Sequence, residues 1–336
     1  MRIDVQGQAR IAHATLTEAL ERDWHDPAHD IDIVRVRLAD LEPRTELEAA
    51  GFLVKPSWIN WMAPLTDSAA AFQQRLSTKE RKSHRYAART AEKSGIELHV
   101  LPSVGEEDVH TFLDLYDQRI AAMSSGVNYA RRQERHLLRH LDTLLGVFAH
   151  ADGVLVGGCL GRLRPDQSLV HLQFSAVTDT ARQSMLARLM YMAAFDAARE
   201  RGYTWASLGN DPSLLGHTAQ PGLFGFKARL GFVPIPTQTL PPKVTGDEAE
   251  LVVRMRALAK PSLSIAYHGH QPAPSQEGLP ASLPLRAVLY SAEPDPPQPV
   301  WLPSSPLPLE YRLVDALTER QRQPPATTSM PRDPRS

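Results

Sequence analysis

The sequence predicts an α/β fold of the α+β kind, in which a mixed, mainly antiparallel and twisted sheet is flanked by helices. Three observations lead to this prediction. Apolar and polar residues alternate in several runs between positions 144 and 178, with the period of half-buried strands. A long run at 184–202 has the apolar spacing of an amphipathic helix. Twenty of the 28 prolines lie from Pro234 onward, which predicts a C-terminal tail with little regular structure.

The composition is that of an ordinary soluble globular protein. Of its 336 residues 42% are hydrophobic, and the formal net charge of −1 argues against general nucleic-acid binding. The single cysteine, Cys159, excludes an intramolecular disulfide, and its apolar neighbours predict a buried strand residue. We expect no metal site, because Pro27 interrupts the helical spacing between His25 and His29. The N-terminus has no apolar signal segment and no run approaches ~18 apolar residues, so we expect a cytoplasmic protein without a membrane partner.

The first part of the chain predicts a small mixed domain. Residues 11–22 have helical spacing, residues 34–38 alternate as a strand, and a short helix ends at Gly51. Two strand-like pieces follow around Pro56. We expect residues 1–76 to form a separate N-terminal part.

A strongly basic helix is predicted from Ser77 to Gly95. Ser77 and Glu80 have the spacing of a capping box, in which each side chain bonds a free backbone N–H of the first turn. One interpretation of the helix is a solvated cover for the body. The other is a contact for phosphate, in a nucleotide, a phosphorylated precursor or the arm of a tRNA. Its basic residues are predicted around much of its circumference: Lys79, Arg81, Lys82, Arg85, Arg89 and Lys93.

The middle of the chain predicts a strand, two helices and an antiparallel meander. Residues 96–101 alternate as a strand, and residues 103–120 and 131–141 have helical spacing, with a break at 124–129. Turn signals at 151–153 and 165–167 then join three strands.

The most informative stretch runs from 169 to 232. It reads as a strand, a turn, a long helix that Gly202 ends, a second strand at 203–208, a polar loop and a short helix. The helix closes with Phe226-Lys227-Ala228-Arg229-Leu230-Gly231-Phe232.

This order of elements and this closing motif resemble the acyl-CoA half of the GNAT acyltransferase superfamily. The superfamily motif is aromatic-tyrosine-x-basic-Leu-Gly-Phe, and in many members the tyrosine protonates the departing thiolate. Lys227 stands in the place of that tyrosine, which is similar to sequences of the divergent Fem-type branch. The resemblance covers roughly residues 77–236. It implies an acyltransferase domain at 77–240, a reduced GNAT-like half at 1–76, and a proline-rich, partly disordered extension at 241–336.

The resemblance also implies a donor site where the strand at 169–177 turns into the long helix. The superfamily's phosphate-binding run, Arg/Gln-x-x-Gly-x-Gly/Ala, would fall at 182–187, but Met185 stands where the first glycine is expected. The free N–H groups at the helix start still offer an anion site, although Ser184 could serve only as a helix cap. The residues expected to contact acetyl-CoA or another acyl-CoA are Val177, Arg182, Gln183, Ser184, Met185 and Phe226.

Three residues are candidates for catalysis. Lys227 projects from the apolar arc of its helix, so its ammonium group either extends out to water or reaches the acyl-transfer centre and stabilises the oxyanion or leaving group. His171 is a candidate base on the polar side of a strand, or a plain exposed histidine. Asp211 is a candidate base beyond a core strand, or part of an Asp-Pro turn.

Three functions are compatible with these residues. The leading one is an N-acyltransferase, in which a small-molecule or peptide amine attacks acyl-CoA directly in a ternary complex. The alternative keeps the fold and uses an aminoacyl-tRNA as donor, as the Fem-type resemblance implies. The basic helix and the missing glycines favour this alternative, whereas the near-neutral charge and the lack of a long helical insertion count against it. The third is a non-catalytic scaffold whose proline-rich tail binds aromatic grooves.

Overall fold

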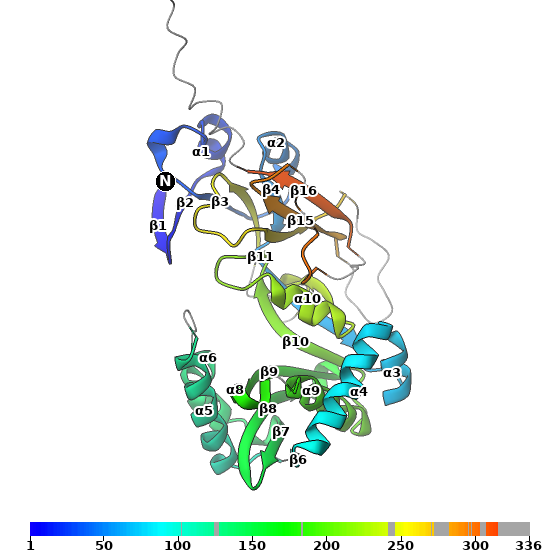
Figure 1. Ribbon diagram of the computed structural model, residues 1–336. Coiled ribbons are helices and arrows are strands. Elements are labelled where there is room, and N and C mark those ends of the chain that lie inside the picture. Colours follow the sequence, from blue (N-terminus) through cyan, green and yellow to red (C-terminus); the bar gives the residue numbers. More distant parts are fainter. Residues whose placement is uncertain are drawn as a thin grey trace, which may run out of the picture. The chain divides into compact units, whose positions relative to one another are not determined.

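The computed structural model describes residues 1–101, 103–123, 128–182, 184–240, 246–269, 271, 282–294, 296, 298–302 and 307–314 (Figure 1). The chain divides into two compact units. The first unit contains residues 1–59, 211–224 and the described part of 236–336, and the second contains residues 60–210 and 225–235. Within the described residues, no helix combines the length and the apolar character that crossing a membrane requires.

The second unit is built on a mixed sheet with the strand order β12-β5-β10-β9-β8-β7-β6. Its outer strands from β6 to β9 form the antiparallel meander that the turn signals predicted. The strands are β5 (Trp58–Pro64), β6 (Ile96–Leu101), β7 (Leu144–Ala151), β8 (Val154–Arg164), β9 (Leu169–Val177), β10 (Trp205–Pro212) and β12 (Val233–Pro236).

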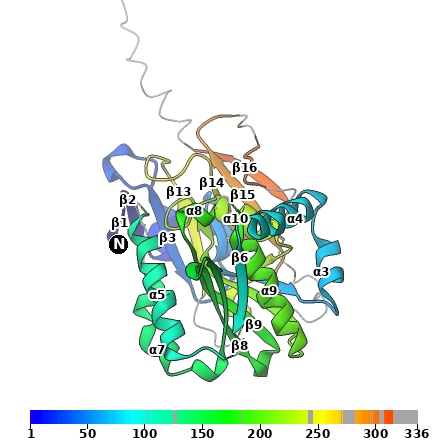
Figure 2. The same cartoon turned by 60° about the horizontal axis from the view of Figure 1, so that its bottom comes forward.

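Helices cover both faces of this sheet (Figure 2). Helix α9 packs on β7, β8, β9 and α4, while α5 packs on β8, β9, α6 and α7. The face under α5 holds an apolar cluster that includes Phe112, Leu160 and Phe174. The helices are α3 (Ala69–Arg75), α4 (Thr78–Lys93), α5 (Glu106–Ala121), α6 (Tyr129–Arg132), α7 (Glu134–Leu138), α8 (Asp179–Arg182), α9 (Leu186–Glu200) and α10 (Gly222–Arg229), with 3₁₀ turns η2 (Leu141–Thr143) and η3 (Pro165–Gln167).

The first unit contains two sheets that share one core. One has the order β1-β2-β3-β13-β4, and the other has the order β11-β14-β15-β16. Ile33 and Val252 from the first sheet pack with Val288 and Tyr290 from the second. The elements are β1 (Arg2–Gln6), β2 (Ala9–His13), α1 (Leu16–Glu21), η1 (Pro27–His29), β3 (Ile33–Leu38), α2 (Arg44–Ala49), β4 (Leu53–Pro56), β11 (Leu214–Leu215), η4 (Thr237–Thr239), β13 (Asp247–Val252), β14 (Ser262–Tyr267), β15 (Leu285–Ser291) and β16 (Leu309–Leu313).

Each of the two units is discontinuous in sequence. Strand β5 follows the early strands of the first unit in sequence but lies in the second unit's sheet, and β13 follows the second unit but lies in the first unit's sheet. The sequence predicted consecutive parts with boundaries at 76 and 240, whereas the compact units interleave. The difference arises because strand partners are chosen by long-range pairing, which periodicity along the chain does not report.

The mixed, mainly antiparallel α+β fold is confirmed, with two differences at the termini. Residues 9–13 form a strand, and the predicted helix at 11–22 is confined to Leu16–Glu21, where Thr15 and Glu18 complete a capping box. The described part of the tail is more regular than predicted, because β13 to β16 are strands and Val288 and Leu289 are fully buried. Much of the predicted extended tail, 272–281 and 315–336 included, lies outside the described residues.

Candidate active site

Strands β9 and β10 are neighbours that pair over only three positions. Leu169, Val170 and His171 lie opposite Trp205, Ala206 and Ser207 in parallel register, and no further pair joins the described strands beyond them. Strand β9 continues to Val177 and β10 to Pro212, so the two strands part along their carboxyl-terminal halves. A bulge on β9 accompanies this divergence: Leu160 pairs with Phe174 and Gly161 with Leu172, so Gln173 has no partner position on β8.

A chain of hydrogen bonds runs from the point of divergence. The backbone N–H of Gly209 donates to Ser207 Oγ at 3.0 Å, and the Ser207 hydroxyl donates to Asn60 Oδ1 at 2.9 Å. Asn60 Nδ2 in turn donates to Asn210 Oδ1 at 2.5 Å. Ser207 is fully buried and Asn210 is exposed, so the chain connects the strand junction with the surface. Gly209 has φ of +77°, which turns β10 away from β9 at a position that favours glycine.

His171 lies at the junction itself. A Cβ atom on Gly209 would lie 3.2 Å from His171 Nε2, so a larger residue at 209 would press on the ring. Burial lowers the pKa of His171 to about 3, and the positive charges of Arg164, Lys227 and Arg162 lower it further. The neutral imidazole is therefore the resting form at neutral pH. Such a low pKa makes the ring a weak base and suits it better to hydrogen bonding.

Lys227 lies on α10 and is buried, with 7% of its surface exposed. Its ammonium nitrogen lies 5.9 Å from the centre of the Trp61 ring on β5, within the range of a cation–π contact. The predicted alternative in which the side chain extends out to water is therefore wrong. The effect of its charge on the pKa of His171 shows that the two predicted residues lie in one electrostatic environment.

Two further polar groups on β9 lie beyond His171. The Oε1 atom of Gln173 is buried and has no hydrogen-bond partner within the described residues. Leaving a buried carbonyl oxygen unpaired costs about 1–3 kcal/mol, so a donor from a bound molecule would be favourable there. Ser175 Oγ shares a hydrogen bond of 2.7 Å with the Tyr191 hydroxyl on α9. Cys159, opposite Ser175, is buried as predicted, and burial raises the pKa of its thiol to about 12.

The turn between β9 and α9 carries the predicted donor residues. Met185 precedes α9 with φ of +58°, a left-handed conformation that non-glycine residues adopt at a cost of roughly 1–2 kcal/mol. Ser184 does not cap the helix, since its hydroxyl donates to the carbonyl of Ala181 and α9 has no side-chain cap. Arg182 is exposed, and Gln183 lies outside the described residues. Val177 ends β9 against Gly157, where a Cβ would lie 2.9 Å from Leu186 Cδ2, so β8 and α9 approach closely.

A buried carboxylate joins α4, α9 and α10. Glu80, 2% exposed, lies 2.5 Å from Arg188 Nε and 3.9 Å from Arg229 Nε. Ser77 caps α4 as predicted, but Glu80 does not reach back to complete the capping box because its oxygens bind the two arginines. The Arg188 guanidinium also lies 5.3 Å from the centre of the Phe226 ring, which lies edge-on to Tyr191 at 6.0 Å. Phe226 is thus held by packing beside α9.

The exposed cations of α4 are concentrated on one side of the helix. At 100° per residue, positions 79, 82, 85, 89 and 93 span an arc of about 120°, opposite the buried Glu80, Ala87 and Ala91. Arg81 lies outside this arc, where its guanidinium bonds the carbonyls of Gln74 and Leu76. The prediction of charge around much of the circumference is therefore wrong. Within the described residues, none of the five side chains makes an ion pair.

The third catalytic candidate, Asp211, is buried with 6% of its surface exposed and belongs to the first unit. Asn60, Trp61 and Ser207 were not among the predicted site residues, and the sheet brings them to the divergence from distant parts of the chain. No sequence signal connects β5 with β10, because Asn60 and Ser207 are 147 positions apart and become neighbours only when the sheet forms. No cluster of three or more metal-ligating side chains occurs within the described residues.

A bulged strand, a short parallel pair that diverges and a long helix after the turn that follows the first strand agree with the predicted GNAT-like fold. The family described as "Acetyltransferase (GNAT) domain" matches residues 78–218. Residues 78–218 therefore form a GNAT domain, which agrees with the predicted resemblance, and this domain is of the acyltransferase class.

Solved structures with a similar fold have low sequence identity to the chain. FemX has 12% identity and a TM-score of 0.43, with 74% of this chain and 82% of that chain covered. L-PGS from Bacillus licheniformis has 15% identity and a TM-score of 0.40, with 74% and 79% covered. A tandem GNAT protein from the clavulanic acid biosynthesis pathway has 13% identity and a TM-score of 0.38, with 67% and 65% covered. No curated protein matches the chain.

Proposed function

We propose that the protein is an N-acyltransferase that joins an acyl group from acyl-CoA to an amine acceptor at the divergence of β9 and β10. One observation carries the proposal. Where these strands part, no ladder pair joins them within the described residues, and buried polar atoms of Gln173, Ser207 and Asn60 lie on β9, β10 and β5. Unpaired strand edges and an unpaired amide oxygen are costly unless a ligand supplies hydrogen bonds.

In the turn before α9, the backbone conformation of Met185 suits a phosphate-bearing donor, whereas its side chain differs from the glycine expected there. Met185 keeps the left-handed conformation that a glycine would adopt without strain. The first N–H groups of α9 lack intrahelical partners and lie at the positive end of the helix dipole, which favours a phosphate. Arg182 adds an exposed cation beside them. Because His171 lies six residues from Val177, or roughly 20 Å along the strand, an extended acyl carrier would have to follow β9.

The proposed roles follow from charge and protonation. The acceptor amine attacks the acyl carbonyl, the carbonyl oxygen gains negative charge, and the carrier's thiolate leaves with the bonding electrons. The ammonium group of Lys227 would stabilise that developing charge, because a buried cation acts strongly in a setting that excludes water. Neutral His171 would accept a hydrogen bond, for instance from the amine. Asp211 remains the proposed base that takes the proton lost by the amine. The proposed acceptor is a small-molecule or peptide amine.

Ligand-induced stabilisation of the purified chain tests the donor. A ligand that binds only the folded state raises the free energy of unfolding by mass action, by about 2.7 kcal/mol at a hundredfold excess over Kd, and so raises the melting temperature. We expect acetyl-CoA to raise it, and CoA with its 3′-phosphate removed serves as a control for the phosphate contacts. No shift at millimolar acetyl-CoA, together with a shift on adding charged tRNA, would refute the CoA proposal.

A second candidate, transfer from an aminoacyl-tRNA, is supported by the exposed cations of α4. Five basic side chains in one arc, without ion pairs within the described residues, form a surface of the kind that phosphate backbones bind. The triple substitution Lys82→Gln, Arg85→Gln and Arg89→Gln should weaken tRNA binding and reduce the slope of log K against log salt by up to about 2.7. The control is Arg132→Gln, Arg135→Gln and Arg139→Gln, which removes the same charge from exposed positions on α6, on α7 and directly after α7. Equal tRNA affinity of both triple variants would favour the other interpretation, in which the cations of α4 only face solvent.

A further inference from the structure

The first unit contains a pocket at the carboxyl ends of two parallel strands. Strands β2 and β3 are parallel at positions 11–13 and 33–35, and the last hydrogen bond between them runs from the Ala14 N–H to the Arg35 carbonyl at 2.9 Å. Beyond that bond β2 leads into α1, while β3 continues to Leu38. The resulting pocket has a volume of about 910 Å³, within the range of about 300–1,000 Å³ for small-molecule sites.

This pocket has the same place in its unit as the candidate active site has in the second unit. In both units two parallel strands are joined by a helical crossover. The two strands pair over three positions and then part, and another strand flanks them. Ligands of sheets with parallel strands bind in the crevice beyond the carboxyl ends of those strands. The topology therefore marks the pocket as a binding position, independently of the function proposed for the second unit.

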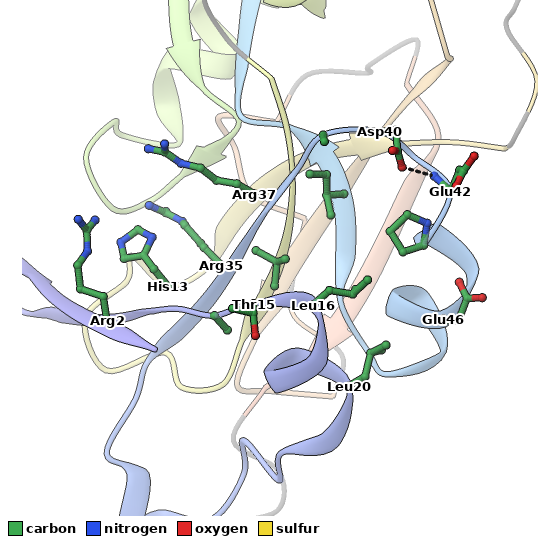
Figure 3. Close-up of a pocket in the computed structure, with 15 residues that line it drawn as sticks. Arg2, His13, Thr15, Leu16, Leu20, Arg35, Arg37, Asp40, Glu42 and Glu46 are labelled. Carbon is green, nitrogen blue, oxygen red and sulfur yellow. Dashed lines mark hydrogen bonds between the residues drawn. The ribbon is translucent and has the colours of Figure 1, made fainter.

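One end of the pocket is basic (Figure 3). Arg2, His13 and Arg35 lie opposite one another on β1, β2 and β3. Asp4 Oδ2 lies 3.0 Å from both Arg2 and His13, and Arg35 is held by the fully buried Glu250 at 2.7 Å. The last basic residue of this end, the exposed Arg37, makes no ion pair within the described residues.

The opposite end is acidic, and the middle is apolar (Figure 3). Asp40, Glu42 and Glu46 are exposed there, and none of them makes an ion pair within the described residues. Between the two ends, Leu16 and Leu20 project from consecutive turns of α1 with 39% and 41% of their surfaces exposed. Covering the exposed apolar side chains of one helix face with a ligand contributes favourably to the free energy of binding.

We propose that this pocket binds a short peptide with free termini and apolar side chains. The carboxylate of the peptide meets Arg37 and its basic neighbours, its ammonium group meets Glu42 and Glu46, and its side chains cover Leu16 and Leu20. A ligand with a single charge is attracted by one end and repelled by the other, so two separated charges on the pocket select a zwitterion.

The test uses the full chain and two peptides, Leu-Leu and Leu-Leu-Leu, with binding followed by calorimetry and by methyl NMR of Leu16 and Leu20. We expect saturable binding of at least one peptide with a Kd below about 1 mM. N-acetylation or C-terminal amidation should each weaken binding about tenfold, the effect of losing one charge-assisted contact of about 1.4 kcal/mol. Arg37→Gln and the double variant Glu42→Gln, Glu46→Gln should each weaken it similarly.

The matched control is Arg201→Gln, which removes an exposed arginine far along the chain from this pocket and should leave peptide binding unchanged. The substituted residues are exposed, so their loss should leave folding intact, which thermal unfolding checks. Three results would each overturn the proposal: no binding of either peptide at millimolar concentration, equal binding of capped and free peptides, or unchanged affinity in the Arg37→Gln chain. Binding of the acetylated peptide alone would indicate an anion site instead.

Discussion

The ammonium group of Lys227 lies in a buried side chain beside the Trp61 ring. Burying a cation is unfavourable unless surrounding groups compensate for the lost hydration. Lys227→Met keeps the length and the apolar stem and removes the charge. If the ammonium stabilises the oxyanion or the leaving group, kcat should fall by about 100-fold or more, measured as steady-state acyl transfer to an amine. A Lys227→Met enzyme with near-normal kcat and an unchanged melting temperature would leave this lysine without a catalytic role.

His171 couples the site to pH. Its pKa in the folded protein is about 3, below the ordinary value of 6.5, because the buried ring is poorly solvated and faces positive charges. As pH falls below about 6.5, the unfolded chain takes up a proton that the folded chain does not bind. The free energy of unfolding should therefore decrease as the pH decreases, by up to about 1.4 kcal/mol per pH unit from this residue.

Urea unfolding at pH 7 and pH 5 measures this effect. We expect the His171→Gln chain to lose less stability between the two pH values than the wild type. His25→Gln, at an exposed position in the first unit, is the control and should retain the full loss. Equal losses in the wild type and His171→Gln would contradict the low pKa.

At the scale of a single element, α9 begins with a residue whose backbone is strained. Met185 adopts a left-handed conformation at the turn where a phosphate would approach. Met185→Gly removes that strain, worth roughly 1–2 kcal/mol, but it also adds freedom to the unfolded chain, worth roughly 0.5–1 kcal/mol. We expect a melting temperature equal to or above the wild type.

The same substitution should tighten acetyl-CoA binding by up to about tenfold, because one additional hydrogen bond to a charged group is worth about 1.5 kcal/mol. Isothermal calorimetry measures the change, and Met185→Ala, which keeps a Cβ in the strained conformation, is the control. A marked loss of stability in Met185→Gly would show instead that the methionine side chain packs in the turn.

At the scale of the whole molecule, the late strands complete the first unit. Strand β15 lies between β14 and β16, and its residues 287–290 are buried. Deleting the chain from residue 271 onward removes β15 and β16 and exposes the strand edge and apolar face of β14. Each large apolar side chain in this interface contributes roughly 1.5–3 kcal/mol. We therefore expect this truncation to abolish soluble expression or two-state unfolding.

A truncation after Val314 is the matched control, because it keeps every residue that the structure describes. It should unfold at the wild-type temperature, as measured by circular dichroism. Wild-type stability of the shorter chain ending at residue 270 would show that β13 and β14 hold the first unit without β15.

The local features of this protein could be predicted from its amino-acid sequence alone. The alternation at 144–177 predicted β7, β8 and β9, the amphipathic spacing predicted α9, and the closing motif with Lys227 predicted the GNAT family. Each of these depends on residues within one element or a short stretch, which periodicity and spacing report directly.

The choice of which distant strands become neighbours is made only when the chain folds. The tertiary structure placed Asn60 beside Ser207, β5 in the sheet of the second unit and β13 in the sheet of the first, and it made β15 a core strand despite its proline-rich surroundings. It also drew Glu80 away from its capping position to Arg188, because a buried carboxylate is more stable beside a cation than beside a backbone N–H alone. Long-range pairing and burial determine these outcomes, and neither can be read from the spacing of residues along one chain.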